Sequence, residues 1–234
     1  MIYNKINDFC AVRNLGSCRK NGMEITPRVK FIIELLESEG IEYELDTFED
    51  KLEDNKYYNI IMRGSSNRMI VAHHDIVNPN IDNANDNSAS VINVIATKKL
   101  RPNINAVILD GEEFGGIGSN RLSKQIIRGD FGDIEWVLNF ELTGRGGKYF
   151  FIGNYPGPLN DRIKNMFDCP IVRTPFNDAV TIRRYGIDST VINPLPPLNG
   201  TEKSQVQFND GKYLDYDLLF NCHSAKDSLS TIST

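Results

Sequence analysis

Histidine is scarce in this chain, and its scarcity narrows the chemistry that the chain can perform. Only three histidines occur among 234 residues, at positions 73, 74 and 223. The four cysteines stand at positions 10, 18, 169 and 222, and no two of them form a Cys-x-x-Cys pair. This spacing argues against a structural zinc site or a disulfide framework, so we expect reduced thiols. Any imidazole-dependent reaction must use the three histidines.

Long apolar runs and an excess of basic residues are also missing. No run approaches the roughly 20 apolar residues that cross a bilayer, and the first ten residues hold no apolar signal-peptide core. The net charge is −5 without any basic block, which argues against a nucleic-acid partner. We therefore expect a cytoplasmic protein that binds neither membranes nor nucleic acid. The hydrophobic fraction of 40% is enough for a substantial core.

Apolar segments alternate with amphipathic segments along the chain. Strand patterns occupy residues 41–48, 57–62, 69–72, 104–109, 134–140, 149–152 and 187–192. Helical patterns occupy residues 6–12, 27–39, 91–100, 119–129, 158–168, 177–185, 213–220 and 224–232. The first two strands can pair as an antiparallel edge. The alternation predicts a single three-layer α/β domain over residues 1–234, with a mixed, mostly parallel sheet between helices and residues 1–25 at the periphery.

One stretch, residues 107–120 (VILDGEEFGGIGSN), combines an apolar run, two adjacent glutamates and a group of glycines. It predicts a buried strand, a turn that carries Glu112 and Glu113, and a helix N-terminus. Ligands of open α/β sheets bind at the carboxyl ends of the strands. Two adjacent carboxylates suit a hydrolytic metal site, because one can bind the cation while the other acts as a general base.

Further carboxylates and imidazoles stand near the ends of other predicted elements. They are His73, Asp75, Asp86, Glu141 and His223. Singly, each has an ordinary structural explanation, such as helix capping for Asp86 or a solvated loop for Glu141. Together they form a set of mixed nitrogen and oxygen donors, which suits Zn²⁺. A carboxylate such as Asp75 can also fix the tautomer and orientation of a metal-binding histidine.

In their order, these motifs resemble those of the di-zinc exopeptidases typified by bacterial leucyl aminopeptidase. That family also includes glutaminyl cyclases and glutamate carboxypeptidase. The matching motifs are His73-His74-Asp75, Asp86-Asn87, the run from Glu112 to Ser119, Glu141, and His223 with Asp227 four residues later. The resemblance covers roughly residues 26–232, and it implies the same α/β fold.

The resemblance also implies a role for each matching residue. Two Zn²⁺ ions, or other divalent ions, would be held by His73, Asp86, Glu113, Glu141 and His223. Asp86 would bridge the ions, with a cis peptide bond to Asn87. Glu112 would be the general base, and Asp75 would orient His73. The implied substrate is a peptide or an amino-acid derivative.

Two positions depart from the aminopeptidases of this family. Most of these aminopeptidases have Asp at the position of Glu141. Glu at this position is closer to related carboxypeptidases and deacylases. Their Ser-Asp-His pocket segment reads Asn177-Asp178-Ala179 here. The resemblance implies hydrolysis of an amide bond, with removal of N-terminal residues from peptides as the favoured activity. Carboxypeptidase or deacylase action, glutamine cyclisation, and a non-catalytic binding domain that keeps the fold stay open, as does the oligomeric state.

Two further expectations concern the substrate pocket. The loop at residues 193–211 is long and rich in Pro and Gly, so we expect it to form part of the pocket wall. Four arginines stand near candidate site residues, at positions 145, 173, 183 and 184. We expect them to serve turns and a solvated helix face, which favours an aminopeptidase over an enzyme that binds a substrate carboxylate.

Overall fold

The computed structural model describes residues 4–12, 25–50, 55–145, 150–194, 208–209, 212–213 and 222–232. Eight strands form one sheet in the order β1-β2-β4-β3-β5-β8-β6-β7. They are β1 (Glu44–Asp50), β2 (Asn55–Met62), β3 (Arg68–His73), β4 (Asn105–Leu109), β5 (Trp136–Phe140), β6 (Phe150–Gly153), β7 (Ile171–Val172) and β8 (Ser189–Pro194). A separate pair consists of β9 (Phe208–Asn209) and β10 (Lys212–Tyr213).

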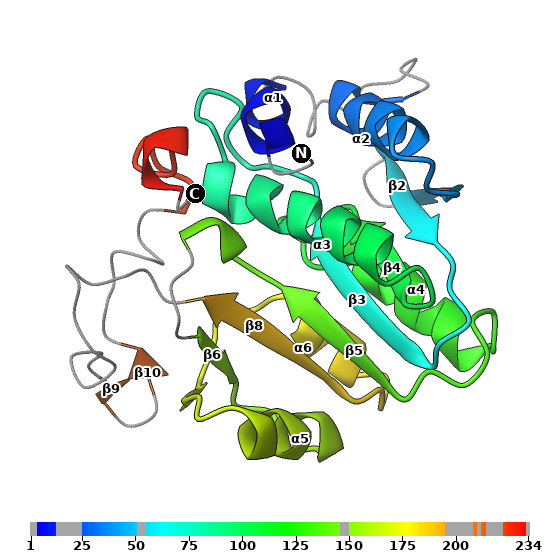
Figure 1. Ribbon diagram of the computed structural model, residues 1–234, viewed down its shortest axis with the longest axis vertical. Helices are drawn as coiled ribbons and strands as arrows, with labels where there is room; N and C mark the ends of the chain where they lie inside the picture. Colours follow the sequence, from blue (N-terminus) through cyan, green and yellow to red (C-terminus); the bar gives the residue numbers. More distant parts are fainter. Residues whose placement is uncertain are drawn as a thin grey trace.

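Helices lie on both sides of the large sheet (Figure 1). They are α1 (Lys5–Ala11), α2 (Pro27–Ser38), α3 (Ala89–Leu100), α4 (Ile117–Ile127), α5 (Pro158–Met166) and α6 (Asp178–Arg183). Short helical turns are η2 (Ala84–Ser88), η3 (Thr143–Arg145) and η5 (Leu229–Thr231). The three-layer α/β fold with a mixed sheet, predicted from the alternation of strand and helix patterns, is confirmed.

The centre of the sheet is parallel and its margins contain antiparallel pairs. β4, β3, β5 and β8 pair in parallel with their neighbours in this central block. β1 pairs antiparallel with β2, as predicted, and β2 pairs antiparallel with β4. β6 is antiparallel to β8 and parallel to β7. The carboxyl ends of the four central strands therefore meet at one edge of the sheet.

Two apolar cores explain why the central strands are apolar on both faces. On β3, Ile70 and Ala72 pack into the core that α2 and α3 share with the sheet. Met69 and Val71 point the other way, into the core that contains residues of α4 and α6. Successive side chains of a strand point to opposite faces. Burial on each face is worth about 1.5–3 kcal/mol per large side chain, so the strand is held from both sides.

The start of α2 follows directly from its sequence. Thr26 precedes the helix, and its side-chain oxygen accepts a hydrogen bond from the Val29 N–H at 3.3 Å. Pro27 occupies the first helical position, where its missing N–H has no helical partner to lose. The buried face includes Val29, Ile32 and Leu36. The predicted helix and its cap are confirmed.

The sheet register aligns the ends of the strands that carry candidate site residues. His73 ends β3 and pairs with Leu109, the last residue of β4. β3 is parallel to β5, and Glu141 directly follows Phe140, the last residue of β5. The turn with Glu112 and Glu113 follows β4. These side chains thus emerge at the same edge of the sheet, where ligands bind in open α/β folds.

The prediction of a helix over residues 224–232 is wrong. Residues 222–228 form turns and bends, and only Leu229–Thr231 make one turn of 3-10 helix. The side chains of this segment instead bind distant or local groups: Asp227 accepts hydrogen bonds from the η2 backbone, and Ser228 bonds to Ser230. Of the helix predicted over 213–220, residue 213 lies in β10 and the remainder lies outside the described residues.

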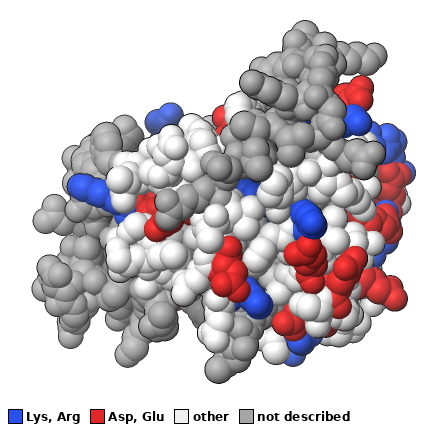
Figure 2. All heavy atoms as spheres, turned by 90° about the horizontal axis from the view of Figure 1, so that it is seen from above, with Lys and Arg blue, Asp and Glu red and all other residues white. Residues whose placement is uncertain are grey.

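The described surface carries charges of both signs. On the face in Figure 2, acidic and basic side chains are interspersed among neutral ones. Within the described ranges, no helix combines the length and the apolar character that crossing a bilayer requires.

Candidate metal centre

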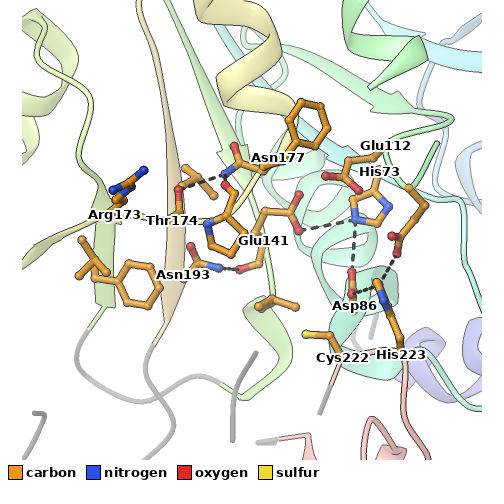
Figure 3. A pocket seen from close by; sticks show the side chains of 17 residues that line it. His73, Asp86, Glu112, Glu141, Arg173, Thr174, Asn177, Asn193, Cys222 and His223 are labelled. Carbon is orange, nitrogen blue, oxygen red and sulfur yellow. Dashed lines mark hydrogen bonds and ion pairs between the residues drawn. The ribbon is translucent and has the colours of Figure 1, made fainter. Parts of the chain in front are cut away.

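A cavity of about 540 Å³ opens at the carboxyl edge of the central strands (Figure 3). This volume lies in the range of small-molecule sites. One end carries a cluster of imidazoles and carboxylates, formed by His73, Asp86, Glu112, Glu113, Glu141 and His223. The remaining wall is mainly apolar and includes Leu142, Phe151, Val172, Pro175, Phe176 and Val191. The sequence-predicted residues are therefore brought together at one end of the cavity.

Asp86 lies between the two imidazoles of the cluster. Its Oδ1 is 3.3 Å from His73 Nε2, and its Oδ2 is 3.1 Å from His223 Nε2. Each imidazole also faces a second carboxylate: His73 Nε2 is 3.6 Å from Glu141 Oε2, and His223 Nε2 is 2.9 Å from Glu113 Oε1. The cluster thus divides into two groups of donors that share Asp86.

The tautomer of His73 is set by its neighbours. Nδ1 lies 3.2 Å from the carbonyl oxygen of Asp75 and 3.4 Å from its Oδ1. Both oxygens are acceptors, so Nδ1 must carry the proton. Nε2 then presents its lone pair to the space beside Asp86 and Glu141. This is the arrangement of a metal-binding histidine with an acceptor behind it.

The Asp86 segment is held by side chains from distant parts of the chain. Asp227 accepts hydrogen bonds from the backbone N–H of Asp86 at 3.1 Å and of the preceding residue at 2.7 Å. The side-chain amide of Asn87 donates to the Phe140 carbonyl oxygen at 3.1 Å. The peptide bond between Asp86 and Asn87 is cis, as the resemblance implied.

The glutamate turn is shaped by glycines and by Asp75. Asp75 accepts hydrogen bonds from the backbone N–H groups of Glu112 and Glu113, at 3.1 and 3.0 Å. A Cβ at position 118 would overlap the backbone oxygen of Asp110, so glycine is needed where α4 passes the end of β4. Gly116 has a φ of 72°, in the left-handed region that favours glycine. Helix α4 begins at Ile117, close to the predicted start.

Without a cation at the site, the surrounding carboxylates favour the imidazolium form of His73 and His223, in which both ring nitrogens are protonated. Burial acts to lower the pKa of His73, but the carboxylates of Glu141, Asp75 and Asp86 outweigh it and raise that pKa well above its usual value. Hydrogen bonds to Asp86 and Glu113 raise the pKa of His223 to about 10. A divalent cation would replace these protons as the positive charge between the carboxylates.

The carboxylates are crowded and poorly hydrated. Burial raises the pKa of Glu113 and of Glu141, and burial together with the charge of Asp178 raises the pKa of Glu112 to about 10. Asp178, fully buried at the start of α6, has its pKa raised to about 7, chiefly by burial. Among these carboxylates, only Asp86 has a lowered pKa, because hydrogen bonds from both imidazoles outweigh the effect of its burial.

This donor set fits Zn²⁺. Ligand atoms of His73, Asp86 and Glu113 lie within 4.8 Å of one another. Glu141 and His223 adjoin this group through the contacts described above, and mixed nitrogen and oxygen donors suit zinc. Among the described residues, the Glu112 carboxylate forms no hydrogen bond or ion pair with either imidazole, although it lines the same cavity. The roles of ligand, base and orienter stay predictions for these residues.

Sequence reasoning missed several parts of the site. Asp227 was identified only as the last residue of the His223 motif. Its carboxylate in fact accepts hydrogen bonds from the backbone N–H groups of Asn85 and Asp86. Arg173 lines the cavity, contrary to the expectation of a purely structural role. Arg183 and Arg184 do have structural contacts, with Asp188 and with the Phe176 ring. The side chain of residue 145 lies outside the described part of the chain.

The loop predicted to line the pocket is described only at its ends. Asn193, near the end of β8, lines the cavity and donates a hydrogen bond to the Glu141 carbonyl oxygen at 3.1 Å. Residues 195–207 and 210–211 lie outside the described residues, so the prediction for them stays a prediction.

Comparison with solved structures shows what the fold resembles. The LapA aminopeptidase of Legionella pneumophila is 12% identical, with a TM-score of 0.71 over 99% of this chain and 66% of that chain. BSAP, a zinc aminopeptidase from Bacillus subtilis, is 16% identical, with a TM-score of 0.58 over 77% of this chain and 46% of that chain. A glutaminyl cyclase from an Acidobacteriales bacterium is 19% identical, with a TM-score of 0.66 over 99% and 87%.

The chain spans slightly under two thirds of the LapA length and less than half of the BSAP length. At such identities the likeness concerns the fold alone. A comparison with curated proteins gives no match. The model of peptidase family M28, in contrast, matches residues 59–190, which is more than half of the 234 residues and runs from within β2 to the start of β8. The chain therefore belongs to peptidase family M28.

Proposed function

We propose that the protein is a two-zinc aminopeptidase that removes the N-terminal residue of a peptide. The observation that carries this proposal is the position of Asp86 between His73 and His223, each of which faces a further carboxylate. One zinc ion would be held by His73, Glu141 and Asp86. The other would be held by Glu113, His223 and Asp86. When bound, zinc supplies a Lewis acid that polarises the scissile carbonyl and acidifies water.

Glu112 is the general base in this proposal. It takes a proton from the attacking water and returns it to the nitrogen of the leaving amine. Burial raises the pKa of Glu112 to about 10 in the metal-free site, and the positive charge of bound zinc would lower it again, so that the carboxylate is free to accept the proton. Asp75 fixes the backbone at Glu112, so the carboxylate stays at the edge of the cavity.

The amino end of the substrate is matched by the negative charge of the cluster. An α-ammonium group needs carboxylates within a few ångströms. Glu141 is the candidate that lines the cavity, and the buried Asp178 lies close enough to interact electrostatically with it. The same wall of carboxylates would repel a substrate that presents its own carboxylate there, which favours an aminopeptidase over a carboxypeptidase at this end of the cavity.

Glutaminyl cyclisation is the second candidate, and one observation favours it. The Acidobacteriales glutaminyl cyclase shares the fold over 99% of this chain, with a TM-score of 0.66. A cyclase releases ammonia from an N-terminal glutamine, without releasing an amino acid. Glu112 would then shuttle the proton between the α-amine and the leaving amide.

The test is a set of matched peptides incubated with zinc-loaded protein and analysed by mass spectrometry. We expect a peptide with a free N-terminus to lose its first residue, and its N-acetylated counterpart to stay intact. Glu112→Gln keeps the side-chain shape but removes the base, so turnover should fall by at least about 10²-fold with little change in zinc content.

Other results would assign the site differently. Equal cleavage of the acetylated peptide would indicate carboxypeptidase or deacylase action. Loss of ammonia from a glutamine-terminated peptide, with no amino acid released, would indicate a cyclase. Absence of any turnover by protein that holds its zinc would indicate a non-catalytic binding domain.

A further inference from the structure

The cavity wall contains one cation that the proposed mechanism does not use. Arg173 directly follows β7 and lines the same cavity as the ligand cluster. Within the described ranges, its side chain forms no hydrogen bond, ion pair or ring contact. Arg183 differs, because it binds Asp188 at 3.2 Å and two backbone carbonyl oxygens. Arg173 is therefore available to a ligand inside the cavity.

Arg173 and the ligand cluster stand at opposite ends of the cavity (Figure 3). The sheet order explains the separation, because β8 and β6 lie between β5 and β7. Glu141 follows β5 and Arg173 follows β7, so three strand spacings, or about 14 Å, separate their backbones. Glu141 and the exposed Arg173 both line the cavity, and the length of their side chains leaves a span of about one or two extended residues between the charged groups.

The wall between the two ends is mainly apolar, with Thr174 and Asn193 among its polar members (Figure 3). Phe151, Val172 and Val191 are at most 2% exposed, and all three line the cavity. The apolar part of this wall packs well against methylene groups and offers them no competing polar contact. A ligand that fits both the wall and Arg173 has a short hydrocarbon stem that ends in an anion.

We propose that Arg173 binds a substrate carboxylate, and that the substrate class is peptides with an N-terminal glutamate. In the proposed aminopeptidase, the first residue enters the cavity while the rest of the peptide leaves toward solvent. The glutamate stem packs on the apolar wall, and its carboxylate pairs with the Arg173 guanidinium, which can bind it through two parallel hydrogen bonds. Glutamate suits this span better than aspartate because its stem is one methylene longer.

The first experiment compares Glu- and Gln-para-nitroanilide, which have nearly the same shape but differ in charge. For the wild-type protein loaded with zinc, we expect a kcat/KM for the glutamyl substrate at least about fivefold higher. In Arg173→Gln the ratio should fall to about one. Arg173→Glu should give a higher kcat/KM for the glutaminyl than for the glutamyl substrate, and it should favour a lysyl substrate. Arg101→Gln removes an exposed arginine beyond the end of α3 and should keep the wild-type ratio.

A carboxylate could also come from the C-terminus of a very short peptide, so a second arm compares Leu-Gly with its C-terminal amide. If Arg173→Gln affects only this pair, Arg173 binds a C-terminal carboxylate and the glutamate assignment is wrong. If neither pair responds to Arg173→Gln, Arg173 binds no carboxylate and the inference fails.

The inference rests on the proposed function, and a binding measurement separates the two. Titration calorimetry with the zinc-loaded protein compares glutarate with its monoamide, glutaramate, in wild type and Arg173→Gln. We expect at least about fivefold tighter binding of glutarate, lost in the variant. If this preference is found but no peptide is hydrolysed, the Arg173 site stands while the proposed activity fails. Equal affinities in the wild type would overturn the Arg173 site even if peptides are cleaved.

Discussion

The Asp75 carboxylate binds the backbone of the turn that carries Glu112: its Oδ1 accepts a hydrogen bond from the Glu112 N–H at 3.1 Å. Its Oδ2 accepts a second bond, from the Glu113 N–H at 3.0 Å. The same residue lies against Nδ1 of His73. Asp75 therefore links His73, a proposed ligand on β3, to the turn after β4 that carries the proposed base and a second ligand. Its contacts thus extend beyond the orientation of His73 that the sequence predicted.

Asp75→Asn tests this link. The amide would place an NH₂ group against one of the two backbone N–H donors, so the turn should shift. We expect zinc affinity and kcat to fall by about 10- to 100-fold each. Zinc affinity is measured by competition with a chelator, and kcat with an aminoacyl substrate. A variant that loses neither would show that the turn is fixed by its glycines alone.

The pKa shifts predict how the stability of zinc-free protein depends on pH. Burial raises the pKa of Glu112 from 4.5 to about 10, and hydrogen bonds raise that of His223 from 6.5 to about 10. Each group binds its proton more tightly in the folded chain than in the unfolded chain. Its stabilising effect is complete below the unfolded-state pKa and is lost as the pH rises through the folded-state pKa.

We therefore expect the Tm of zinc-free protein to fall as the pH is raised from about 5 to 10. Added zinc should flatten this dependence, because it replaces the protons. Zinc-free Glu112→Gln lacks one of the titrating groups and should show a shallower fall. The measurement is differential scanning calorimetry in a chelating buffer. A Tm that rises with pH over this interval would contradict the account.

Arg28 is a second link between the site and the rest of the chain. It is fully buried at the start of α2, where its Nε donates to the His74 carbonyl oxygen at 2.7 Å and its Nη2 donates to Ser88 Oγ at 3.0 Å. Its guanidinium lies 3.9 Å from the ring centroid of Phe9 in α1. Arg28 thus ties the two helices to the backbone beside His73 and to the Ser88 side chain in η2.

Arg28→Met should lower the free energy of unfolding by about 2–4 kcal/mol, because buried acceptors lose a charged donor. It should also weaken zinc binding, since His74 adjoins a proposed ligand. Urea unfolding of zinc-loaded protein measures the first effect. Arg101→Met is the control and should change stability by less than about 0.5 kcal/mol. Equal effects of the two substitutions would mean that Arg28 has no special role.

Much of the fold could be predicted because its signals are local. The central strands are apolar on both faces, and Thr26 and Pro27 mark the start of α2 by their own side-chain chemistry. Part of the cluster could be predicted because His73, the glutamate turn and Glu141 end or follow strands at one edge of the sheet, whereas Asp86 and His223 were placed by the resemblance of their motifs. Local patterns failed at residues 224–232, where Asp227 binds the backbone of a segment about 140 positions earlier in the sequence instead of supporting a helix.

The place of Arg173 could not be predicted for a related reason. Its position in the cavity depends on β6 and β8 lying between β5 and β7, an order that differs from their order in the chain. Hydrophobic periodicity predicts each strand but not its neighbours. The roles of Phe151 and Val191 as cavity wall depend on the same sheet order.

X-ray diffraction recorded at the zinc absorption edge, from crystals grown with zinc, tests the central claim most directly. We predict two anomalous peaks about 3.5–4 Å apart. One should lie against His73 and Glu141, the other against Glu113 and His223, and both against Asp86. Zinc bound only elsewhere on the protein, or no zinc at this cluster in protein saturated with the ion, would contradict the account.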